Sequence, residues 1–465
     1  MEVKAADIQN AYITAPVIEK IWTTCGPEFG SDAGKRAYIV RALYGLKSAR
    51  YCYTHHMRDC MRTLGWNSCL ADQDVWMKAD TKPDGTEYYA YLLWYVDDAL
   101  CIHHDAEKVL RQIDRLFKMK PGSIGDPKFY LGAKLKPMRL NNGVICWSFS
   151  SSKYVQVAVQ NVKDYLKANN LPPLEKNAPT PFKSGYEPML DTTPELDYDR
   201  ANYFQSQIGM LRWMVELGRV DMITEVSLLS SHLALPREGH LEALFHIYAY
   251  LARKHNARMA FDPSYPDINL ADFKLDQNWK AIYGDVQEPI PPNAPKPRGK
   301  PVDLRLFVDS DHAGDKVTRR SRTGFYIFMN NETIVWQSRK QATVETSVFG
   351  AEFVALKFGM DTLRGIRYKL RMMGIELTGP SYVYGDNMSV IHNTQTPESV
   401  LKKKSNSVCY HAVRESAAMK EILTGYVPTG ENPADPATKV LPGGCKRDYL
   451  LSKVIYDLDG NHGDD

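Results

Sequence analysis

The sequence predicts an α+β protein in which proline-rich stretches separate several domains. Runs of aromatic and β-branched residues favour strands toward both ends of the chain, and helical periodicity dominates between them. Prolines crowd residues 285–301 and, more weakly, residues 171–194, where they favour extended chain over regular packing. Several predicted strands also end in an acidic residue. The first two observations set the fold class and its divisions, and the third indicates where a functional site would lie.

The proline-rich stretches set the expected domain boundaries. We expect a first strand-bearing domain over residues 1–170, a mostly helical part over 171–284, a linker over 285–301 and a second strand-bearing domain over 302–445. Residues 446–465 end in an acidic run and are predicted to be a frayed tail.

The first domain contains the clearest predicted hairpin. Residues 88–96 are an apolar run of strand-forming residues, and a turn signal at residues 83–85 precedes it. A second apolar run, residues 99–102, follows at once. Asp97 and Asp98 are therefore expected at the bend of the hairpin.

Further along the chain the predicted elements include both helices and strands. Residues 107–119 and 239–251 are predicted to be helices, the first with an amphipathic apolar face. A strand over 304–308 opens the last domain, and residues 324–329 and 333–337 are predicted to be a pair of strands.

Composition excludes several classes of protein. A content of 44% hydrophobic and 24% charged residues is ordinary for a globular protein. A net charge of +3 is too small to indicate a nucleic-acid partner by itself. The 8 cysteines form no C-x-x-C pair, which favours free thiols in a reducing compartment. The pairs His55-His56 and His103-His104 also lack metal-ligand spacing. No apolar run approaches the ~18–20 residues that span a bilayer, so we expect an intracellular protein, cytoplasmic or nuclear, without a membrane partner.

Asp97 and Asp98 form the most informative pair in the sequence. Two carboxylates held this close repel each other unless cations lie between them. Such oxygen ligands select Mg²⁺ or Mn²⁺, and paired metal ions on carboxylates catalyse phosphoryl transfer. Asp-Asp is also an ordinary turn sequence, so the pair alone leaves both interpretations open.

Asp7 supplies a third acid, and Tyr12 follows it closely. This spacing would let the acid hold a metal ion while the ring lies beside the sugar of an incoming nucleotide, where it would clash with a ribose 2′-OH. The simpler interpretation is an aspartate at a strand end and a tyrosine in the core. Gly45 could let the backbone approach a base pair and Lys47 could contact phosphate; the alternative is a plain helix start after a turn.

The last domain carries four separated acids in similar settings. Asp309 and Asp386 end predicted strands, Glu352 lies in a predicted helix, and Asp435 lies near a predicted helix start. Acids from strand ends and helices can converge on two metal ions that activate water against a phosphodiester. Any one of them taken alone is more simply a helix cap or a solvated acid.

Several motifs of the first two parts occur in a recognisable order. They are Asp7-Ile8-Gln9-Asn10-Ala11-Tyr12, Leu43-Tyr44-Gly45-Leu46-Lys47, Tyr95-Val96-Asp97-Asp98, Tyr130-Leu131-Gly132, Arg219-Val220-Asp221, and His240 with Tyr250-Leu251. In this order they resemble the reverse transcriptase of copia-type (Pseudoviridae) LTR retrotransposons and the connection that follows it. The resemblance implies a palm with Asp7, Asp97 and Asp98 as the catalytic, metal-binding acids, and substrate contacts from Tyr12, Gly45, Lys47 and Tyr95.

The last domain resembles the RNase H domain of the same elements. The supporting motifs are Ser321-Arg322-Thr323-Gly324-Phe325, Trp336-Gln337-Ser338-Arg339-Lys340-Gln341, Tyr410-His411 with Arg414-Glu415, and Tyr426-Val427-Pro428-Thr429. This implies an α/β domain with a mixed sheet in which Asp309, Glu352, Asp386 and Asp435 are the catalytic metal ligands. The implied cofactor is Mg²⁺ or Mn²⁺, and the implied partners are an RNA template, a DNA primer, an RNA–DNA hybrid and dNTPs. Virus-like particles, a homo-oligomer and other polyprotein products also belong to what the resemblance implies.

Three interpretations of the activity remain open from the sequence. The first is an RNA-directed DNA polymerase with RNase H activity. Because the basic fingers segment expected before Asp7 is not in the sequence, the second is a chain with RNase H activity alone. The third is a catalytically silent remnant that binds nucleic acid. The family pattern is also broken at Arg50, at Gly350, and at Ser405-Asn406-Ser407, without loss of a predicted metal ligand.

Overall fold

The computed structural model describes residues 1–402 and 404–458, and the chain forms two compact units. Unit 1 contains residues 1–131, 291–300 and 368–376. Unit 2 contains the other described residues. The boundary after residue 131 lies well before the expected boundary at residue 170.

Unit 1 is built on an antiparallel five-stranded sheet. The strands, in the order β1-β7-β6-β5-β4, are β1 (Glu2–Asp7), β7 (Asp98–His103), β6 (Glu87–Tyr95), β5 (Asp72–Thr81) and β4 (Asn67–Cys69). Helices α1 (Ala49–Thr63) and α2 (Ala106–Asp114) bury their apolar faces in one core with Trp76 and Trp94 of the sheet. The predicted hairpin is confirmed, since β6 and β7 pair on either side of Val96 and Asp97.

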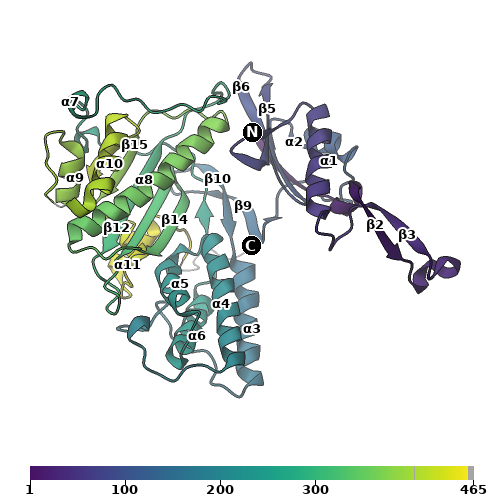
Figure 1. Ribbon diagram of the computed structural model, residues 1–465, viewed down its shortest axis with the longest axis horizontal. Helices are drawn as coiled ribbons and strands as arrows, with labels where there is room; N and C mark the ends of the chain where they lie inside the picture. The colour runs from purple at the N-terminus through teal and green to yellow at the C-terminus, as the bar shows by residue number, and fades with distance from the viewer. Residues whose placement is uncertain (403, 459–465) are drawn as a thin grey trace. The chain divides into compact units, whose positions relative to one another are not determined.

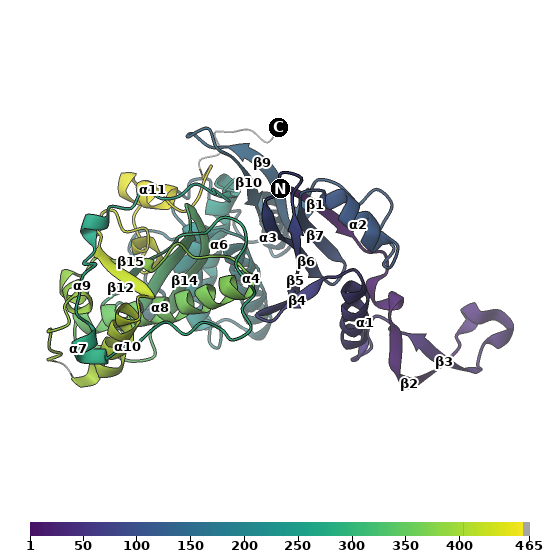
Figure 2. The same cartoon turned by 90° about the horizontal axis from the view of Figure 1, so that it is seen from above.

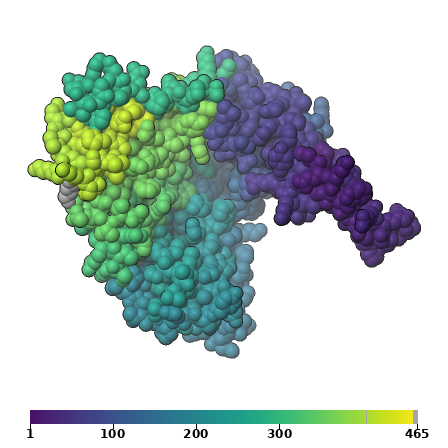
Figure 3. All heavy atoms as spheres, in the orientation of Figure 1, coloured from purple at the N-terminus to yellow at the C-terminus, as the bar shows by residue number. Residues whose placement is uncertain are grey.

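A two-stranded hairpin projects from unit 1. It consists of β2 (Pro16–Thr24) and β3 (Arg36–Arg41), which pair antiparallel. Figure 2 shows it leaving the rest of the unit beside α1, and the space-filling view in Figure 3 shows the same arm standing clear of the other atoms of unit 1. Several of its apolar side chains remain exposed, among them Trp22 at 63%, whose ring lies against that of Tyr38.

Part of the proline-rich stretch is packed structure rather than a free linker. Residues 291–300 belong to unit 1, together with the end of a long helix that follows later in the chain. Tyr89 donates a hydrogen bond to the Lys296 carbonyl at 3.0 Å, and Tyr91 donates one to the Met373 carbonyl at 2.7 Å. The expected spacer over 285–301 therefore differs from the structure, because residues 291–300 pack within unit 1 and Tyr89 of the sheet satisfies one of their carbonyl groups.

A helical layer and a small sheet form the first part of unit 2. The helices are α3 (Ser152–Ala168), α4 (Tyr198–Glu216), α5 (Ile223–Leu229) and α6 (Glu238–Arg253), and they gather in one region of Figure 1 around a common core. Strands β9 (Ala133–Arg139), β10 (Ile145–Ser150) and β11 (Met259–Ala260) pair antiparallel beside them. Helices α4, α5 and α6 lie within the range 171–284 that was expected to be mostly helical, and α3, β9 and β10 belong to the same unit rather than to residues 1–131.

The second sheet of unit 2 is mixed. Its order is β14-β13-β12-β15-β16, formed by β14 (Glu332–Lys340), β13 (Arg322–Met329), β12 (Leu304–Asp311), β15 (Ser381–Gly385) and β16 (Ile422–Tyr426). The first three strands are antiparallel, whereas β12, β15 and β16 run parallel. Helix α8 (Val348–Met372) crosses this sheet in Figure 1, and it packs so closely that a Cβ on Gly359 would lie 3.0 Å from Leu306.

The remaining elements are short. They are η1 (Ala11–Thr14), η2 (Pro27–Asp32), β8 (Phe129–Tyr130), η3 (Pro188–Leu190), η4 (Val220–Met222), η5 (Ser230–His232), η6 (Leu270–Asp272), α7 (Lys280–Tyr283), α9 (Met388–Gln395), η7 (Lys404–Asn406), α10 (Ser407–Ala418), η8 (Asp435–Ala437) and α11 (Cys445–Ser452).

The expected tail over 446–465 is wrong for its first half. Helix α11 occupies Cys445–Ser452, and Leu450, Leu451 and Val454 are buried. These apolar side chains anchor the segment in the core of unit 2. The acidic residues 459–465 lie outside the described residues. Among the helices that the structure describes, none is long and apolar enough to span a membrane, and all eight cysteines are free thiols.

Two candidate metal centres

The turn between β6 and β7 places the first pair of acids. Val96 has a φ of 56°, which is an uncommon conformation for a β-branched residue. Its carbonyl accepts hydrogen bonds from the Tyr53 hydroxyl at 2.8 Å and from Trp94 Nε1 at 3.0 Å. Because Tyr53 and Trp94 are buried, the strained turn is held from within the core.

The third acid of this site lies directly across the sheet. In the antiparallel pair of β1 and β7, Asp7 is opposite Asp98, so their side chains share one face. Asp7 Oδ2 accepts a hydrogen bond from Lys120 Nζ at 2.6 Å. Asp7 Oδ1 is buried and finds no hydrogen-bond partner among the described residues. The three predicted acids thus lie around one strand end, with one carboxylate oxygen unsatisfied.

The repulsion between the carboxylates of this first site is moderate. Burial raises the pKa of Asp98, the charges of Asp97 and Asp7 raise it further, and Lys120 opposes them. Asp7 keeps 36% of its side chain exposed and Lys120 keeps 48%. Solvent therefore screens much of the repulsion between the three acids.

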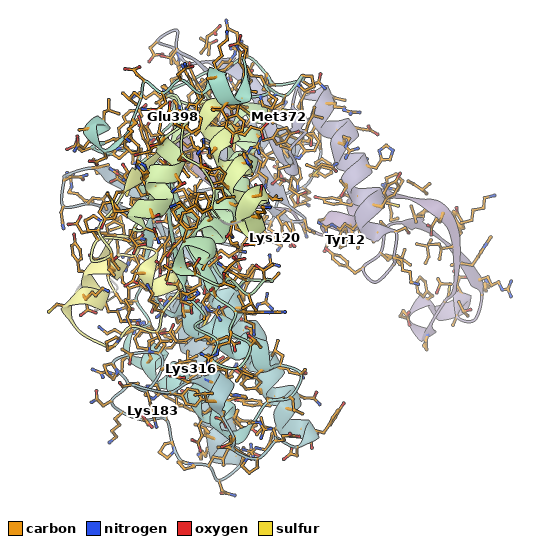
Figure 4. The ribbon with its side chains drawn as sticks, turned by 60° about the vertical axis from the view of Figure 1, so that its left-hand side comes forward. Tyr12, Lys120, Lys183, Lys316, Met372 and Glu398 are labelled. Atoms are coloured by element: carbon orange, nitrogen blue, oxygen red, sulfur yellow. The ribbon has the colours of Figure 1, made fainter. Side chains whose placement is uncertain are left out.

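The predicted substrate contacts lie near this site to different degrees. The Tyr12 ring contacts the rings of Tyr44 and Tyr53 at centroid distances of 4.8 and 5.7 Å, and Tyr53 in turn holds the Val96 turn. Figure 4 shows Tyr12 where the β2–β3 hairpin leaves the body of unit 1. Tyr95 is exposed at 46% beside the turn.

Gly45 and Lys47 lie in the exposed segment that leads into α1. Gly45 has a φ of 93°, and a Cβ there would meet nothing within 4 Å. The positive φ, rather than a close neighbour in the structure, therefore explains why glycine occupies this position.

The second site is built on neighbouring strand ends of the mixed sheet. Asp309 lies in β12, and Asp386 follows β15 directly; the two strands are parallel, with Val308 opposite Gly385. Glu352 reaches the same place from α8. Asp309, Glu352 and Asp386 each offer a carboxylate oxygen, and these oxygens lie within 4.8 Å of one another.

Burial dominates the electrostatics of this second site. Asp309 is 1% exposed and Glu352 is 7% exposed. Burial raises the pKa of Glu352 well above its usual value, and the charges of Asp309 and Asp386 raise it further. Burial likewise raises the pKa of Asp309, against the opposing effect of Lys439. A cluster of buried carboxylates is strongly unfavourable when charged unless a cation joins it.

The fourth predicted acid is held by lysines. Asp435 Oδ1 accepts from Lys439 Nζ at 2.7 Å, and Asp435 Oδ2 accepts from Lys446 Nζ at 2.7 Å. Lys439 Nζ also lies 3.1 Å from Asp309 Oδ2. Asp435 therefore neighbours the three clustered acids through a shared ammonium group, and it does not join their 4.8 Å cluster.

Gly324 explains how Asp435 comes so close to the sheet. It lies in β13 directly opposite Asp309. A Cβ at this position would lie 2.8 Å from the Ala437 backbone and 2.7 Å from Thr438 Cγ2. The missing side chain thus leaves the space in which the segment carrying Asp435 packs. Sequence reasoning noted this glycine only as part of a motif.

Asp311 and Asp315 follow Asp309 closely in the sequence, and both have other partners. Asp311 Oδ1 accepts from the backbone N–H of Arg322, and burial raises the pKa of Asp311 to about 6. Asp315 Oδ2 accepts from Lys340 Nζ at 3.0 Å.

Two of the matched motifs have structural roles. Arg219 makes a bidentate ion pair with Asp221 at 2.9 and 2.7 Å, and Tyr250 donates to the same carboxylate at 2.7 Å. All three side chains are buried. His240 Nδ1 accepts from the backbone N–H of Arg237 at 3.0 Å at the start of α6. These residues organise the helical layer and lie in no acidic cluster.

One cluster was missed by sequence reasoning. Asp80, His103 and His104 bring potential ligand atoms within 4.8 Å of one another, although the His-His spacing lacked a metal pattern. His103 Nε2 lies 2.7 Å from Asp80 Oδ2, and His103 Nδ1 accepts from the Asp105 N–H at 2.8 Å. In neutral His103 the proton is therefore on Nε2, where a metal ion would have to bind. The hydrogen bonds fit an imidazole that is satisfied by protein groups.

Both acidic sites have donor sets that fit Mg²⁺ or Mn²⁺. Carboxylate oxygens are the ligands that these hard cations prefer. In the first site Asp7 Oδ1 has no hydrogen-bond partner among the described residues, and in the second site three converging carboxylates face the single ammonium group of Lys439. The residues therefore suit divalent cations at both places.

Comparison with known proteins gives sequence relatives along nearly the whole chain. Residues 1–165 match the family described as reverse transcriptase (RNA-dependent DNA polymerase). The retrovirus-related Pol polyprotein from transposon RE1 of Arabidopsis thaliana is 24% identical over 94% of this chain and 26% of that protein. The Pol polyprotein from transposon TNT 1-94 of Nicotiana tabacum is 25% identical over 99% of this chain and 31% of that protein. The chain thus spans about a quarter to a third of the length of these relatives.

Solved structures give weaker similarities. The foamy viral protease–reverse transcriptase in complex with an RNA/DNA hybrid is 11% identical over 95% of this chain and 45% of that chain, with a TM-score of 0.42. The N-terminal RNase H domain of a Mycobacterium tuberculosis protein is 14% identical over 33% of this chain and 96% of that chain, with a TM-score of 0.23.

Proposed function

We propose that this chain, which is the reverse transcriptase region of a copia-type Pol polyprotein, carries two separate phosphoryl-transfer sites. The first would be an RNA-directed DNA polymerase site in unit 1, and the second an RNase H site in unit 2 that cleaves the RNA strand of an RNA–DNA hybrid. The observation that supports this proposal is the presence of two separate groups of acids, one where Asp7 lies opposite Asp98 in unit 1 and one where Asp309, Glu352 and Asp386 converge in unit 2.

In the polymerase site, Asp7, Asp97 and Asp98 would hold the metal ions. Bound Mg²⁺ or Mn²⁺ supplies activation of the primer 3′-OH and stabilises charge on the leaving pyrophosphate. The turn at Val96 fixes the direction of Asp97 and Asp98, and Lys120 balances the charge of Asp7 until nucleotide binds. Tyr12 would lie against the sugar and exclude ribonucleotides, while Gly45, Lys47 and Tyr95 would contact primer, template or triphosphate.

In the nuclease site, Asp309, Glu352 and Asp386 would hold metal, and Asp435 would complete the ligand set. Bound metal ions supply the activation of a water molecule for attack on a phosphodiester. The buried position of Asp309 and Glu352 excludes bulk water and keeps the carboxylates fixed. Thr429 donates to Asp386 Oδ2 at 2.7 Å and so orients the most accessible of the three clustered acids.

The partners follow from these two reactions. An RNA template, a DNA primer and dNTPs would use the first site, and an RNA–DNA hybrid would use the second. We place the protein inside the cell, in a virus-like particle, the cytoplasm or the nucleus, and in association with a second copy or with other products of its polyprotein.

The test is a paired assay of primer extension and hybrid cleavage on one purified sample of the full chain. Asp97→Asn with Asp98→Asn should reduce extension by orders of magnitude and leave cleavage intact. Asp309→Asn should do the reverse. Loss of both activities in either folded variant would contradict two separate sites, and the absence of both activities in the unmodified chain would favour a silent nucleic-acid-binding remnant.

A second candidate function is RNase H activity alone. It is favoured by the convergence of the nuclease acids, whose oxygens lie within 4.8 Å of one another, whereas Asp7, Asp97 and Asp98 do not form such a cluster among the described residues. Hybrid cleavage without primer extension by the full chain would establish this second candidate.

A further inference from the structure

Lys439 lies where a cation would bridge two of the nuclease acids. Its Nζ is 3.1 Å from Asp309 Oδ2 and 2.7 Å from Asp435 Oδ1. Both carboxylates are 1% exposed. The ammonium group is therefore the positive charge that connects Asp435 with the cluster of Asp309, Glu352 and Asp386.

We propose that the ammonium group of Lys439 occupies the binding position of one divalent metal ion, between Asp309 and Asp435, and competes with that ion for this position. This position is called the seat below. This inference rests on the proposed nuclease function. It predicts that the metal-free site binds its first ion through Asp309, Glu352 and Asp386, and that a second ion binds only when Lys439 has moved away.

The exchange is physically reasonable because the two cations use the same oxygen atoms. A metal ion bridging Asp309 and Asp435 would need the oxygens that Lys439 now contacts, and two positive charges cannot share that position. Lysine is a compact point charge on a flexible stem, so the same residue can leave one seat and occupy another. The seat is thus filled in the absence of metal without leaving two buried carboxylates unbalanced.

The surroundings give Lys439 a place to go. Its side chain is 39% exposed, in contrast to the buried acids that it joins. It also lines a cavity of about 230 Å³ together with Asp311, Asp315 and Tyr186. A displaced ammonium group could therefore remain beside Asp311 instead of being expelled into solvent.

Lys446 provides a matched comparison within the same site. It pairs with Asp435 Oδ2 at 2.7 Å, on the other oxygen of the carboxylate that Lys439 contacts. No hydrogen bond joins Lys446 to Asp309 in the described part of the chain. Removal of either lysine deletes one positive charge next to Asp435, but only removal of Lys439 vacates the position between the two acids.

The experiment counts Mn²⁺ ions bound to the full chain by electron paramagnetic resonance, without nucleic acid. All variants carry Asp97→Asn and Asp98→Asn, so that ions at the polymerase acids do not contribute. In this background we expect one tight ion and a second ion that binds at least about tenfold more weakly. Lys439→Met and Lys439→Gln should each tighten the second ion by about tenfold, which corresponds to a seat that is vacant about a tenth of the time in the parent.

Two controls separate occupancy of the seat from a general effect of charge. Lys439→Arg keeps a cation and should leave the second ion weak. Lys446→Met removes the same charge as Lys439→Met and should tighten the second ion much less. Two equally tight ions in the parent, unchanged binding in both neutral Lys439 variants, or equal effects of Lys439→Met and Lys446→Met would each overturn the inference.

Failure of the proposed function gives a different result. If Asp309→Asn in the same background leaves all Mn²⁺ binding unchanged, then the acid cluster holds no metal and the nuclease proposal falls with the inference. If Asp309→Asn abolishes the tight ion while the Lys439 variants have no effect, then the metal site stands and only the inference fails. Thermal melting in a chelator verifies that each variant is folded.

Discussion

The two acidic sites of this protein solve one electrostatic problem in different ways. In unit 1, Asp7 and Asp98 lie across an antiparallel pair, partly exposed, with one lysine salt-bridged to Asp7. In unit 2, Asp309 of β12 and Glu352 of α8 are both buried, and Lys439 balances their repulsion from within the protein. The first site relies on solvent to tolerate its charges, and the second relies on a cation of its own.

The difference also concerns how each site is held in shape. The acids of unit 1 depend on one strained turn, fixed by hydrogen bonds from Tyr53 and Trp94. In unit 2, the position of Asp435 depends on close packing of the Ala437–Thr438 segment against Gly324, which lies opposite Asp309. Changes in packing should therefore damage the second site most, and loss of single hydrogen bonds should damage the first.

The largest effect is expected from Gly324→Ala. The new methyl group would meet the Ala437 backbone at 2.8 Å, so the segment with Asp435 and Lys439 must shift. A displacement of about 1 Å at a catalytic group can reduce the rate about 100-fold. Hybrid cleavage should fall by about that factor while any primer extension is unchanged. Gly365→Ala, where a Cβ meets nothing within 4 Å, is the control; a Gly324→Ala variant with full cleavage activity would show that Asp435 is not held by this contact.

Tyr12→Ala should reduce sugar discrimination in the first site. If the ring lies against the 2′ position, its removal should raise ribonucleotide use relative to deoxynucleotide use by about tenfold or more, the scale of a lost steric contact. Tyr12→Phe keeps the ring and should retain the preference. Single-nucleotide extension with dNTPs and rNTPs measures the ratio, and a melting curve reports the loss of the contacts with Tyr44 and Tyr53. An unchanged ratio in a destabilised Tyr12→Ala variant would instead assign Tyr12 to the core.

Tyr53→Phe should weaken the first site by a smaller amount. It removes the 2.8 Å hydrogen bond to Val96 and leaves the bond from Trp94 in place. The loss of about 1 kcal/mol should lower primer extension by up to about tenfold, because Asp97 and Asp98 lose part of their support. Tyr51→Phe, on the exposed face of the same helix, is the matched control. Equal rates for both variants would mean that Trp94 alone fixes the turn.

Sequence reasoning captured the parts of both sites that local patterns determine. Residues 88–103 show two apolar runs around two acids, and this pattern is enough to place Asp97 and Asp98 at a hairpin bend. Asp309 and Asp386 each end an apolar run, and parallel strands that lie side by side bring such ends together. The mixed sheet followed from the family resemblance carried by these motifs.

Contacts between distant segments were the part that sequence could not supply. Lys439 and Lys446 hold Asp435, but Lys446 lies in a segment that was expected to be a tail. Two departures from the family pattern also meet in space: Asn406 donates to Glu345 Oε2 at 3.0 Å, and a Cβ on Gly350 would lie 2.6 Å from that same oxygen. A single sequence shows such substitutions one by one and gives no sign that they share a neighbour.

The smallest effect is expected from Glu352→Gln. This substitution should raise the stability of the metal-free protein while it impairs the function of the site. Burial raises the pKa of Glu352 in the folded protein, so folding becomes less favourable as pH rises above the usual range of a glutamate. In a chelator at pH 8, Glu352→Gln should therefore raise the free energy of unfolding of unit 2, because it removes a buried carboxyl group that resists ionisation. The gain should vanish at pH ~3, where the carboxyl is protonated in both the folded and the unfolded state. Asp97→Asn, in the more exposed site, should change stability much less at either pH.

Added Mn²⁺ should reverse the order of stability of the parent and Glu352→Gln. It should stabilise the parent more than the variant, because only the parent keeps all three clustered ligands. Chemical denaturation at both pH values, with and without Mn²⁺, measures all four cases; a Glu352→Gln variant that is less stable than the parent in chelator at pH 8 would show that the buried carboxyl is satisfied without a metal ion.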